Sequence, residues 1–387
     1  MQNSLVLRRR DLLGAACCLA ASPLVTPVSF AAMPGENRFV TILLRGAMDG
    51  LDLVQPHGDR LFAALRPKLA LGGDAGLIDL DGFFGLHPEA AALEPLYRSG
   101  ELGFVHAVST SYRDVRSHFD GQDFLESGGA RGTTGEGGWL NRVLSLTDAR
   151  LSAVDVSPTR EIILSGPNPA EVWSPRSDMS LAEDELQMLA RLYRNDPDFS
   201  EALTEAVGLD RYTDLLRGDD MPGQGSAATA RMAASLLKQT YRIASFSLNG
   251  WDTHVNQKGQ FKSAVNGLAS AVITLKEDLG PAIWDKTAVI AVTEFGRSAR
   301  ENSNGGTDHG TGGCAVIAGG AIRGGKVFGR WPGLDDANLL DQRDLMPTGD
   351  VRSVAAALLA SQYGISRSAL EKTVFPGMQY DGKAAFL

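Results

Sequence analysis

The sequence predicts an α/β fold, a doubly wound and mostly parallel sheet with a helical insertion. Short uninterrupted apolar runs, such as residues 39–44 and 288–292, recur along the chain, and buried parallel strands have this form. Segments with helical periodicity alternate with these runs, as crossover helices do between parallel strands. Polar residues follow several of the runs directly. Because α/β enzymes bind ligands beyond the carboxyl ends of their strands, these residues are expected to converge on one crevice.

The first residues of the 387-residue chain predict an export signal. Arg9 and Arg10 precede an apolar stretch at residues 12–20, which is too short to span a membrane. We interpret residues 1–31 as a twin-arginine signal peptide; a short N-terminal anchor helix is the alternative. The twin-arginine translocase would then be a partner during export, and the mature protein would be periplasmic or secreted. Residues 32–387 are expected to form one domain.

Composition excludes some classes of function. The chain is 43% hydrophobic and 21% charged, which is ordinary for a globular protein. The formal charge is −9, and it becomes −11 when three arginines and one aspartate leave with the signal. An acidic chain without a basic block is a poor nucleic-acid binder. No later segment reaches ~20 apolar residues, so stable membrane insertion is not expected. The oligomeric state is left open.

The predicted elements follow the chain in order. Strands are expected at residues 39–44, 102–108, 161–164, 242–248, 288–292, 314–318 and 322–327. Helices are expected at about residues 89–97, 117–126, 259–279 and 351–363. Residues 178–240 have a helical pattern and are interpreted as an insertion that covers one face of the sheet or forms a lid over the pocket.

The stretch around residues 287–320 carries the densest polar cluster. Glu294 and Arg297 follow one predicted strand, and Asp308 and His309 precede the next. A carboxylate, a guanidinium and an Asp-His pair between two apolar runs predict a metal and anion site.

Two further loops carry metal-binding residue types. Asp49 lies a few residues beyond the first strand; it is either a metal ligand or the cap of the next helix or turn. Asp252 and His254 follow the strand at 242–248, and carboxylate plus imidazole suits zinc, manganese or iron. The alternative there is a structural Asp-Thr turn with an exposed histidine.

Ser117 begins a predicted helix after the strand at 102–108. A serine at a helix N-terminus gains from the exposed amides and the positive end of the dipole, so it is a candidate nucleophile. Arg116 and His118 flank it. The alternative is a plain helix cap beside a packed histidine.

The motifs LLRGAMDGLD, VRSHFDGQDF, NGWDTH, VTEFGRS and GTDHGTGG, behind a twin-arginine signal, resemble the domain-of-unknown-function 1501 (DUF1501) family. These are exported bacterial proteins of the alkaline phosphatase/sulfatase clan, and the resemblance covers essentially the whole mature chain. It implies an alkaline phosphatase-like fold and a site for two metals.

By this resemblance, Asp49 matches the clan's first-strand aspartate, Asp252 and His254 its loop pair, and His309 its distal histidine. The clan usually spaces the loop pair more widely. Glu294 and Phe295 occupy the place of an Asp-His pair, so one metal position loses a histidine.

The nucleophile implied by the resemblance is Ser117, or Asp114 in an alternative register. A formylglycine sulfatase is disfavoured because Cys314, the only cysteine after the signal, is not in a Cys-x-Pro-Arg setting.

The expected function is an exported metal-dependent hydrolase of a phosphate or sulfate ester, carried on a small molecule or glycan. One or two divalent ions, zinc or manganese, would activate Ser117 or a water. Arg297 and Arg116 would neutralise the ester oxygens, and His118 would act as acid/base or extra ligand. The expected ligands are Asp49, Asp252, His254, Glu294 and His309, with Asp308 a ligand or an orienting residue. The alternative is a non-catalytic exported binding or assembly protein with the same fold.

Overall fold

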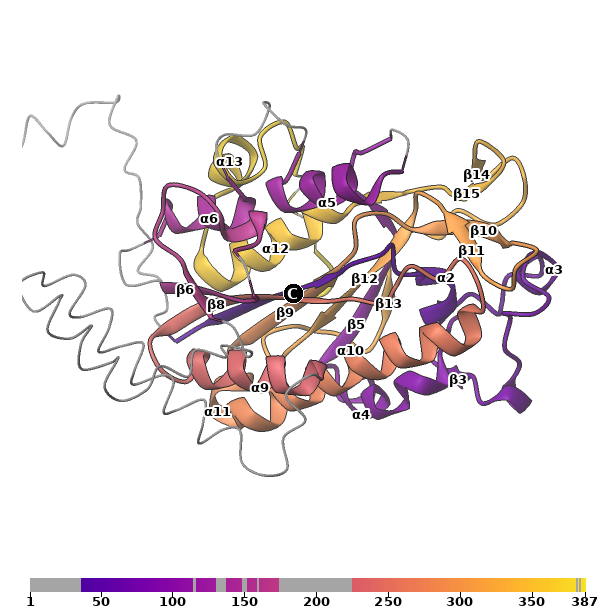
Figure 1. Ribbon diagram of the computed structural model, residues 1–387, viewed down its shortest axis with the longest axis horizontal. Coiled ribbons are helices and arrows are strands. Elements are labelled where there is room, and N and C mark those ends of the chain that lie inside the picture. The colour runs from indigo at the N-terminus through magenta and orange to yellow at the C-terminus, as the bar shows by residue number, and fades with distance from the viewer. Residues whose placement is uncertain are drawn as a thin grey trace, which may run out of the picture. The chain divides into compact units, whose positions relative to one another are not determined.

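A nine-stranded sheet forms the centre of the fold (Figure 1). The computed structural model describes residues 36–113, 116–129, 137–147, 152–158, 160–173, 225–380, 382 and 384–387. The strand order is β13-β5-β12-β9-β1-β8-β6-β7, and β16 also pairs with β5. These strands are β1 (Arg38–Leu44), β5 (Leu102–Ser109), β6 (Ser152–Val156), β7 (Glu171–Trp173), β8 (Tyr241–Leu248), β9 (Thr287–Val292), β12 (Gly313–Ala318), β13 (Val327–Phe328) and β16 (Gly349–Asp350).

The sheet is parallel except for β12. Strand β1 runs parallel to β8 and β9, and β6 runs parallel to β7 and β8. Strand β12 is antiparallel to both of its neighbours, β9 and β5. It therefore begins at the edge of the sheet where β1, β5, β8 and β9 end. Residues that precede β12 in the chain consequently meet residues that follow the other strands.

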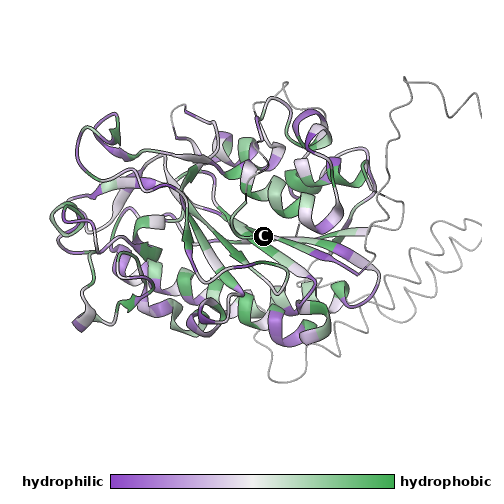
Figure 2. Cartoon of the chain, turned by 180° about the vertical axis from the view of Figure 1, so that it is seen from behind, coloured by the Kyte–Doolittle hydropathy of each residue, from purple (hydrophilic) through white to green (hydrophobic). Residues whose placement is uncertain are grey.

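Helices cover both faces of the sheet. Helices α9 (Ser226–Leu237), α10 (Gln257–Leu279), α4 (Glu94–Arg98) and α11 (Pro281–Trp284) lie on one face (Figure 1). Helices α5 (His118–Ser127), α6 (Trp139–Leu144) and α12 (Val351–Tyr363) lie on the other. Every residue of β1, β9 and β12 is buried, as expected for apolar strands covered on both sides. Figure 2 shows the hydrophobic strands between helices that carry hydrophilic residues.

Smaller elements complete the fold. One small sheet has the order β11 (Thr307–His309), β10 (Arg297–Glu301), β15 (Asp344–Leu345), β14 (Leu339–Leu340), and the other has the order β2 (Val54–Gln55), β4 (Gly85–Leu86), β3 (Ile78–Asp79). The remaining helices are α2 (Gly50–Leu53), α3 (Phe62–Leu65), α13 (Arg367–Ala369), three 3-10 helices (Gly73–Ala75, Pro88–Leu93, Ile162–Leu164) and the π-helix Leu370–Val374.

The α/β class and the mostly parallel sheet are confirmed, and two strand predictions are wrong. Residues 162–164 form a 3-10 helix because carboxylates accept the amides that a ladder would use: Glu126 binds the Ile163 amide at 3.1 Å, and Asp155 binds the Glu161 amide at 2.6 Å. Of residues 322–327, only Val327 lies in a strand, β13; Gly325 and Lys326 each make one backbone hydrogen bond to β5, and the rest of the segment has no regular structure.

Parts of two predictions lie outside the described residues: the signal peptide at 1–31 and residues 178–224 of the expected insertion. The rest of that segment contains α9, which contacts α10 and strands β8 and β6. Within the described residues, no helix has the length and apolar character needed to cross a membrane.

The buried Asp155 gives the fold a pH-dependent stability. Burial and the nearby Glu161 carboxylate raise the pKa of Asp155 to about 7. The unfolded value is about 3.9, so unfolding releases this proton in the window between them, and the free energy of unfolding falls as the pH rises through it. We expect Asp155→Asn, which stays neutral, to be more stable relative to wild type at pH 8 than at pH 5 by at least about 1 kcal/mol. Urea unfolding at both pH values measures this, and an equal difference at the two would contradict it.

Candidate functional site

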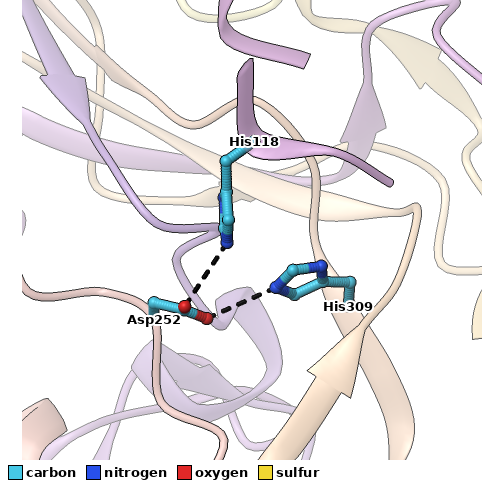
Figure 3. Close-up of side chains that lie close together, drawn as sticks. All are labelled: His118, Asp252 and His309. Carbon is cyan, nitrogen blue, oxygen red and sulfur yellow. Dashed lines mark hydrogen bonds and ion pairs between the residues drawn. The ribbon is translucent and has the colours of Figure 1, made fainter. Parts of the chain in front are cut away.

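Three side chains meet beyond the carboxyl edge of the sheet: His118, Asp252 and His309 (Figure 3). One ligand atom from each lies within 4.8 Å of the others. His118 Nε2 is 3.5 Å from one Asp252 oxygen, and His309 Nε2 is 3.3 Å from the other. His118 begins α5, Asp252 follows β8, and His309 ends β11.

The reversed direction of β12 brings these residues together. His309 precedes β12, whereas His118 and Asp252 follow β5 and β8, and all three positions lie at one edge of the sheet. The loops also need glycine to pass so closely. A Cβ on Gly46, whose φ is +116°, would lie 2.6 Å from the Asp252 amide nitrogen, and one on Gly296 would lie 1.9 Å from the carbonyl oxygen of Gly312.

Both histidine rings are oriented by an acceptor on Nδ1. His118 Nδ1 donates to Glu294 at 2.7 Å, and His309 Nδ1 donates to the Arg116 carbonyl at 2.9 Å. Because a carboxylate and a carbonyl only accept, each ring offers the lone pair of Nε2 to the cluster. His118 Nε2 is buried and, within the described residues, has no hydrogen-bond partner. Metal-binding histidines are held in this way, so the residues fit a metal ion.

Hydrogen bonds from neighbouring side chains favour the ionised form of Glu294 and Asp252. The hydrogen bond that His118 donates to Glu294 raises the pKa of His118. Burial opposes ionisation of Glu294 and Asp252, but the hydrogen bonds of His118 and Arg297 respectively outweigh it and lower the pKa of each carboxyl. Burial, assisted by the charges of Arg297 and His118, lowers the pKa of His309. Deprotonated imidazole and carboxylate are the forms that bind metals, so the lowered pKa values of His309 and Asp252 favour binding, whereas the raised pKa of His118 means that binding there releases a proton.

His254 lies beside the three-residue cluster. Its Nε2 is 3.0 Å from Asp252 and 2.9 Å from His309 Nε2. Two ring nitrogens so close share a proton or bind one cation. Asp308 is farther out: its carboxylate is 3.8 Å from His254 Nδ1 and is 56% exposed.

Arg297 is completely enclosed by protein oxygens. Its Nε donates to the Ala47 carbonyl at 2.7 Å, and its Nη2 donates to Asp252 at 2.6 Å. Further bonds reach the carbonyls of Gly46, Trp251 and Thr307. With a side chain that is 0% exposed, Arg297 holds the loops and Asp252 rather than facing a substrate.

Asp49 and Glu294 are held by contacts with other protein groups. Asp49 is buried, its Oδ2 pairs with Arg66 at 2.8 Å and accepts from Gln257 at 2.8 Å, and its Oδ1 caps α2 through the Leu51 amide. The structure therefore does not bring Asp49 to the cluster. Its bond to the Leu51 amide is that of a helix cap, which is the alternative role expected for it from the sequence. Among the described residues, Glu294 meets the cluster through its hydrogen bond with His118.

Ser117 is the N-cap of α5. Its hydroxyl accepts from the Asp120 amide at 3.4 Å, and within the described residues no recorded contact joins it to the cluster. Arg116 has a left-handed backbone (φ +56°), which points its carbonyl at His309, while its guanidinium pairs with Asp344 at 2.7 Å. The alternative nucleophile Asp114 lies outside the described residues.

Sequence reasoning missed two residues of the site. Arg66 neutralises Asp49, and no local motif marks it. Gln122 binds Glu294 at 3.3 Å and Arg45 at 2.9 Å. It lies four residues after His118, so it faces the same side of α5, and that spacing was a usable signal.

A pocket of about 570 Å³ opens beside the cluster. It is lined by Arg45, Gly46, His118, Gln122, Asn249, Gly250, Asp252, Gln260 and Ser263. A molecule bound there could reach an ion held by the cluster.

Comparisons with known proteins were made for family, sequence and structure. A family described as "Protein of unknown function (DUF1501)" matches residues 108–374, which is more than half of the chain. None of the curated proteins matches. Similar solved structures include an alkaline phosphatase superfamily protein from Vibrio parahaemolyticus, with 12% identity and a TM-score of 0.38 over 84% of this chain and 72% of that one. The C-terminal periplasmic domain of EcEptC from Escherichia coli, in complex with Zn, has 7% identity and a TM-score of 0.40 over 74% of each chain. Alkaline phosphatase from the Antarctic bacterium TAB5 has 14% identity and a TM-score of 0.34 over 73% and 92%.

Glu294 is expected to control metal affinity through His118. Glu294→Gln keeps an acceptor but removes the charge behind the ring, so zinc affinity should fall about 10- to 100-fold. Competition with a chelator measures it. The matched control is Glu101→Gln, which removes a carboxylate that pairs with Lys276. Equal affinity for zinc in the Glu294 variant and wild type would contradict this role.

The Arg66–Asp49 pair is expected to stabilise the fold. Arg66→Met leaves a buried carboxylate unpaired, which should cost about 3–5 kcal/mol of unfolding free energy. The double variant Asp49→Asn/Arg66→Met removes the uncompensated charge and should recover part of the loss. Denaturant unfolding of the two variants and wild type measures the coupling; no recovery in the double variant would argue against a charge effect.

Proposed function

The chain belongs to the DUF1501 family, and we propose that it is an exported, metal-dependent hydrolase of phosphate or sulfate esters. The observation that carries the proposal is the pair of imidazoles, His118 and His309, each fixed through Nδ1 and each directing Nε2 toward Asp252. The twin-arginine pattern at residues 9–13 supports export to the periplasm or beyond.

In this proposal, His118, Asp252 and His309 hold one divalent ion, zinc or manganese. Two imidazoles and a carboxylate match the donor set of catalytic sites that keep a position open. The ion pair at Asp49 argues against a second ion. Arg66 lies 2.8 Å from Asp49 and already neutralises it, so a further cation at that carboxylate would meet a buried positive charge.

The bound ion would act as a Lewis acid on the ester and lower the pKa of a water beside it. Arg297 holds Asp252 in position and compensates its charge. Glu294 and the Arg116 carbonyl hold the two rings so that each Nε2 would face the ion. His254, 40% exposed and 3.0 Å from Asp252, is placed to give a proton from Nε2 to the leaving ester oxygen. Water supplies the oxygen that becomes part of phosphate or sulfate, and the alcohol leaves with that proton.

Water is the proposed nucleophile because Ser117 is used as a helix cap. Ser117→Ala should lower unfolding free energy by about 1 kcal/mol through loss of the cap. Turnover should stay within a few fold of wild type. Loss of turnover by orders of magnitude, with metal content unchanged, would assign the nucleophile to Ser117 instead.

A non-catalytic binding protein is the second candidate. It is favoured by two exposed apolar side chains, Phe119 and Val255, which are 84% and 53% exposed and directly follow His118 and His254. An exposed apolar pair near a cluster suits a partner surface as well as a substrate.

Metal analysis with an activity panel separates the two functions. Protein purified after export with its own signal should carry about one equivalent of metal and hydrolyse one class among aryl phosphates, aryl phosphate diesters and aryl sulfates. Asp252→Ala should lose both the metal and the turnover, because it removes the carboxylate shared by both histidines. Metal without turnover on any ester would favour the binding protein, and neither metal nor turnover would contradict the hydrolase.

A further inference from the structure

A pocket whose lining residues are mainly polar lies beside the cluster, and His118 and Asp252 form part of its wall. Its volume of about 570 Å³ lies within the range of small-molecule sites. Any ester whose reacting group lay at His118 and Asp252 would place the rest of the molecule in this pocket. The chemistry of the remaining lining residues therefore selects the alcohol part of the substrate.

The pocket wall contains three neutral polar side chains that can form hydrogen bonds with a ligand: Asn249, Gln260 and Ser263. All three are exposed, and none of these side chains forms a hydrogen bond with another described residue. Amides and hydroxyls can each both donate and accept, as sugar hydroxyls do. A fourth neutral group, Gln122, is fixed in orientation by Arg45 and Glu294.

The lining residues disfavour ligands that carry a second anionic group or a large apolar group. Arg45 is the one guanidinium among the described lining residues, and it is matched by Glu126 at 2.8 Å and Glu161 at 3.1 Å. A second anionic group would therefore find no uncompensated guanidinium there. The lining also contains no aliphatic or phenyl side chain for an acyl or aryl group.

We propose that this pocket binds a sugar, so that the substrates are sugar phosphate or sugar sulfate esters. The inference rests on the proposed hydrolase function, because that function puts the ester group at the cluster. Attack of water on phosphorus or sulfur would break its bond to the sugar oxygen. The products would be the free sugar, protonated at that oxygen, and inorganic phosphate or sulfate.

Saturation-transfer NMR on the metal-loaded full chain tests the pocket without requiring turnover. Glucose and N-acetylglucosamine are the probes, with 4-nitrophenol and octanol as the apolar comparison. At least one sugar should bind. The variant Asn249→Ala/Gln260→Leu should weaken that binding at least about 10-fold, since two hydrogen-bonding groups are lost. Gln239→Leu, an exposed glutamine outside the pocket, is the matched control and should bind as wild type does.

Absence of sugar binding, undiminished binding in the double variant, or preferential binding of the apolar probes would each overturn the inference. Metal content and melting temperature of each variant report whether it is intact. Hydrolysis of aryl phosphates and sulfates by wild type is measured in parallel. Sugar binding without any hydrolysis would support the pocket and contradict the hydrolase, whereas hydrolysis without sugar binding would do the reverse.

Discussion

The buried guanidinium of Arg297 is the interaction on which the arrangement of the site depends. It joins the carbonyls of Gly46 and Ala47 after β1, Trp251 after β8 and Thr307 on β11, and it ends on the Asp252 carboxylate. A buried cation surrounded by five protein oxygens is costly to desolvate, so it persists only where the surrounding loops are fixed. These loops are thereby held at one distance from each other, and Asp252 is held in one orientation toward the two histidines.

The second constraint is the direction of β12. In a fully parallel sheet, the segment preceding β12 would lie at the opposite edge from the segments that follow β5 and β8. The reversal puts His309 at the same edge as His118 and Asp252, and the Gly296–Gly312 contact lets the two loops cross. The acceptors on Nδ1, Glu294 and the Arg116 carbonyl, then determine which nitrogen faces the cluster. Strand order and ring orientation together create a donor set suited to a cation.

Much of the sheet could be predicted from the sequence, because apolar runs such as residues 39–44 and 288–292 are typical of strands covered on both faces. The segment at 161–164 looked equally apolar, but distant carboxylates on α5 and β6 satisfied its amides and allowed a helical turn. The polar residues at the strand ends could also be identified, because they directly follow these apolar runs in the sequence. The partners of these residues could not be predicted. Arg66 and Gln257, for example, are far from Asp49 in sequence, and no local pattern shows that they surround it.

His118, Asp252 and His309 are proposed to form a single metal centre. Anomalous diffraction from crystals grown with zinc, recorded on both sides of the zinc absorption edge, is the sharpest test of this proposal. We expect one strong peak within bonding distance of His118 Nε2, His309 Nε2 and an Asp252 oxygen, at about 2.0–2.2 Å from each. A peak bonded to Asp49, a second peak of equal height beside Arg297, or no peak at the cluster would contradict it.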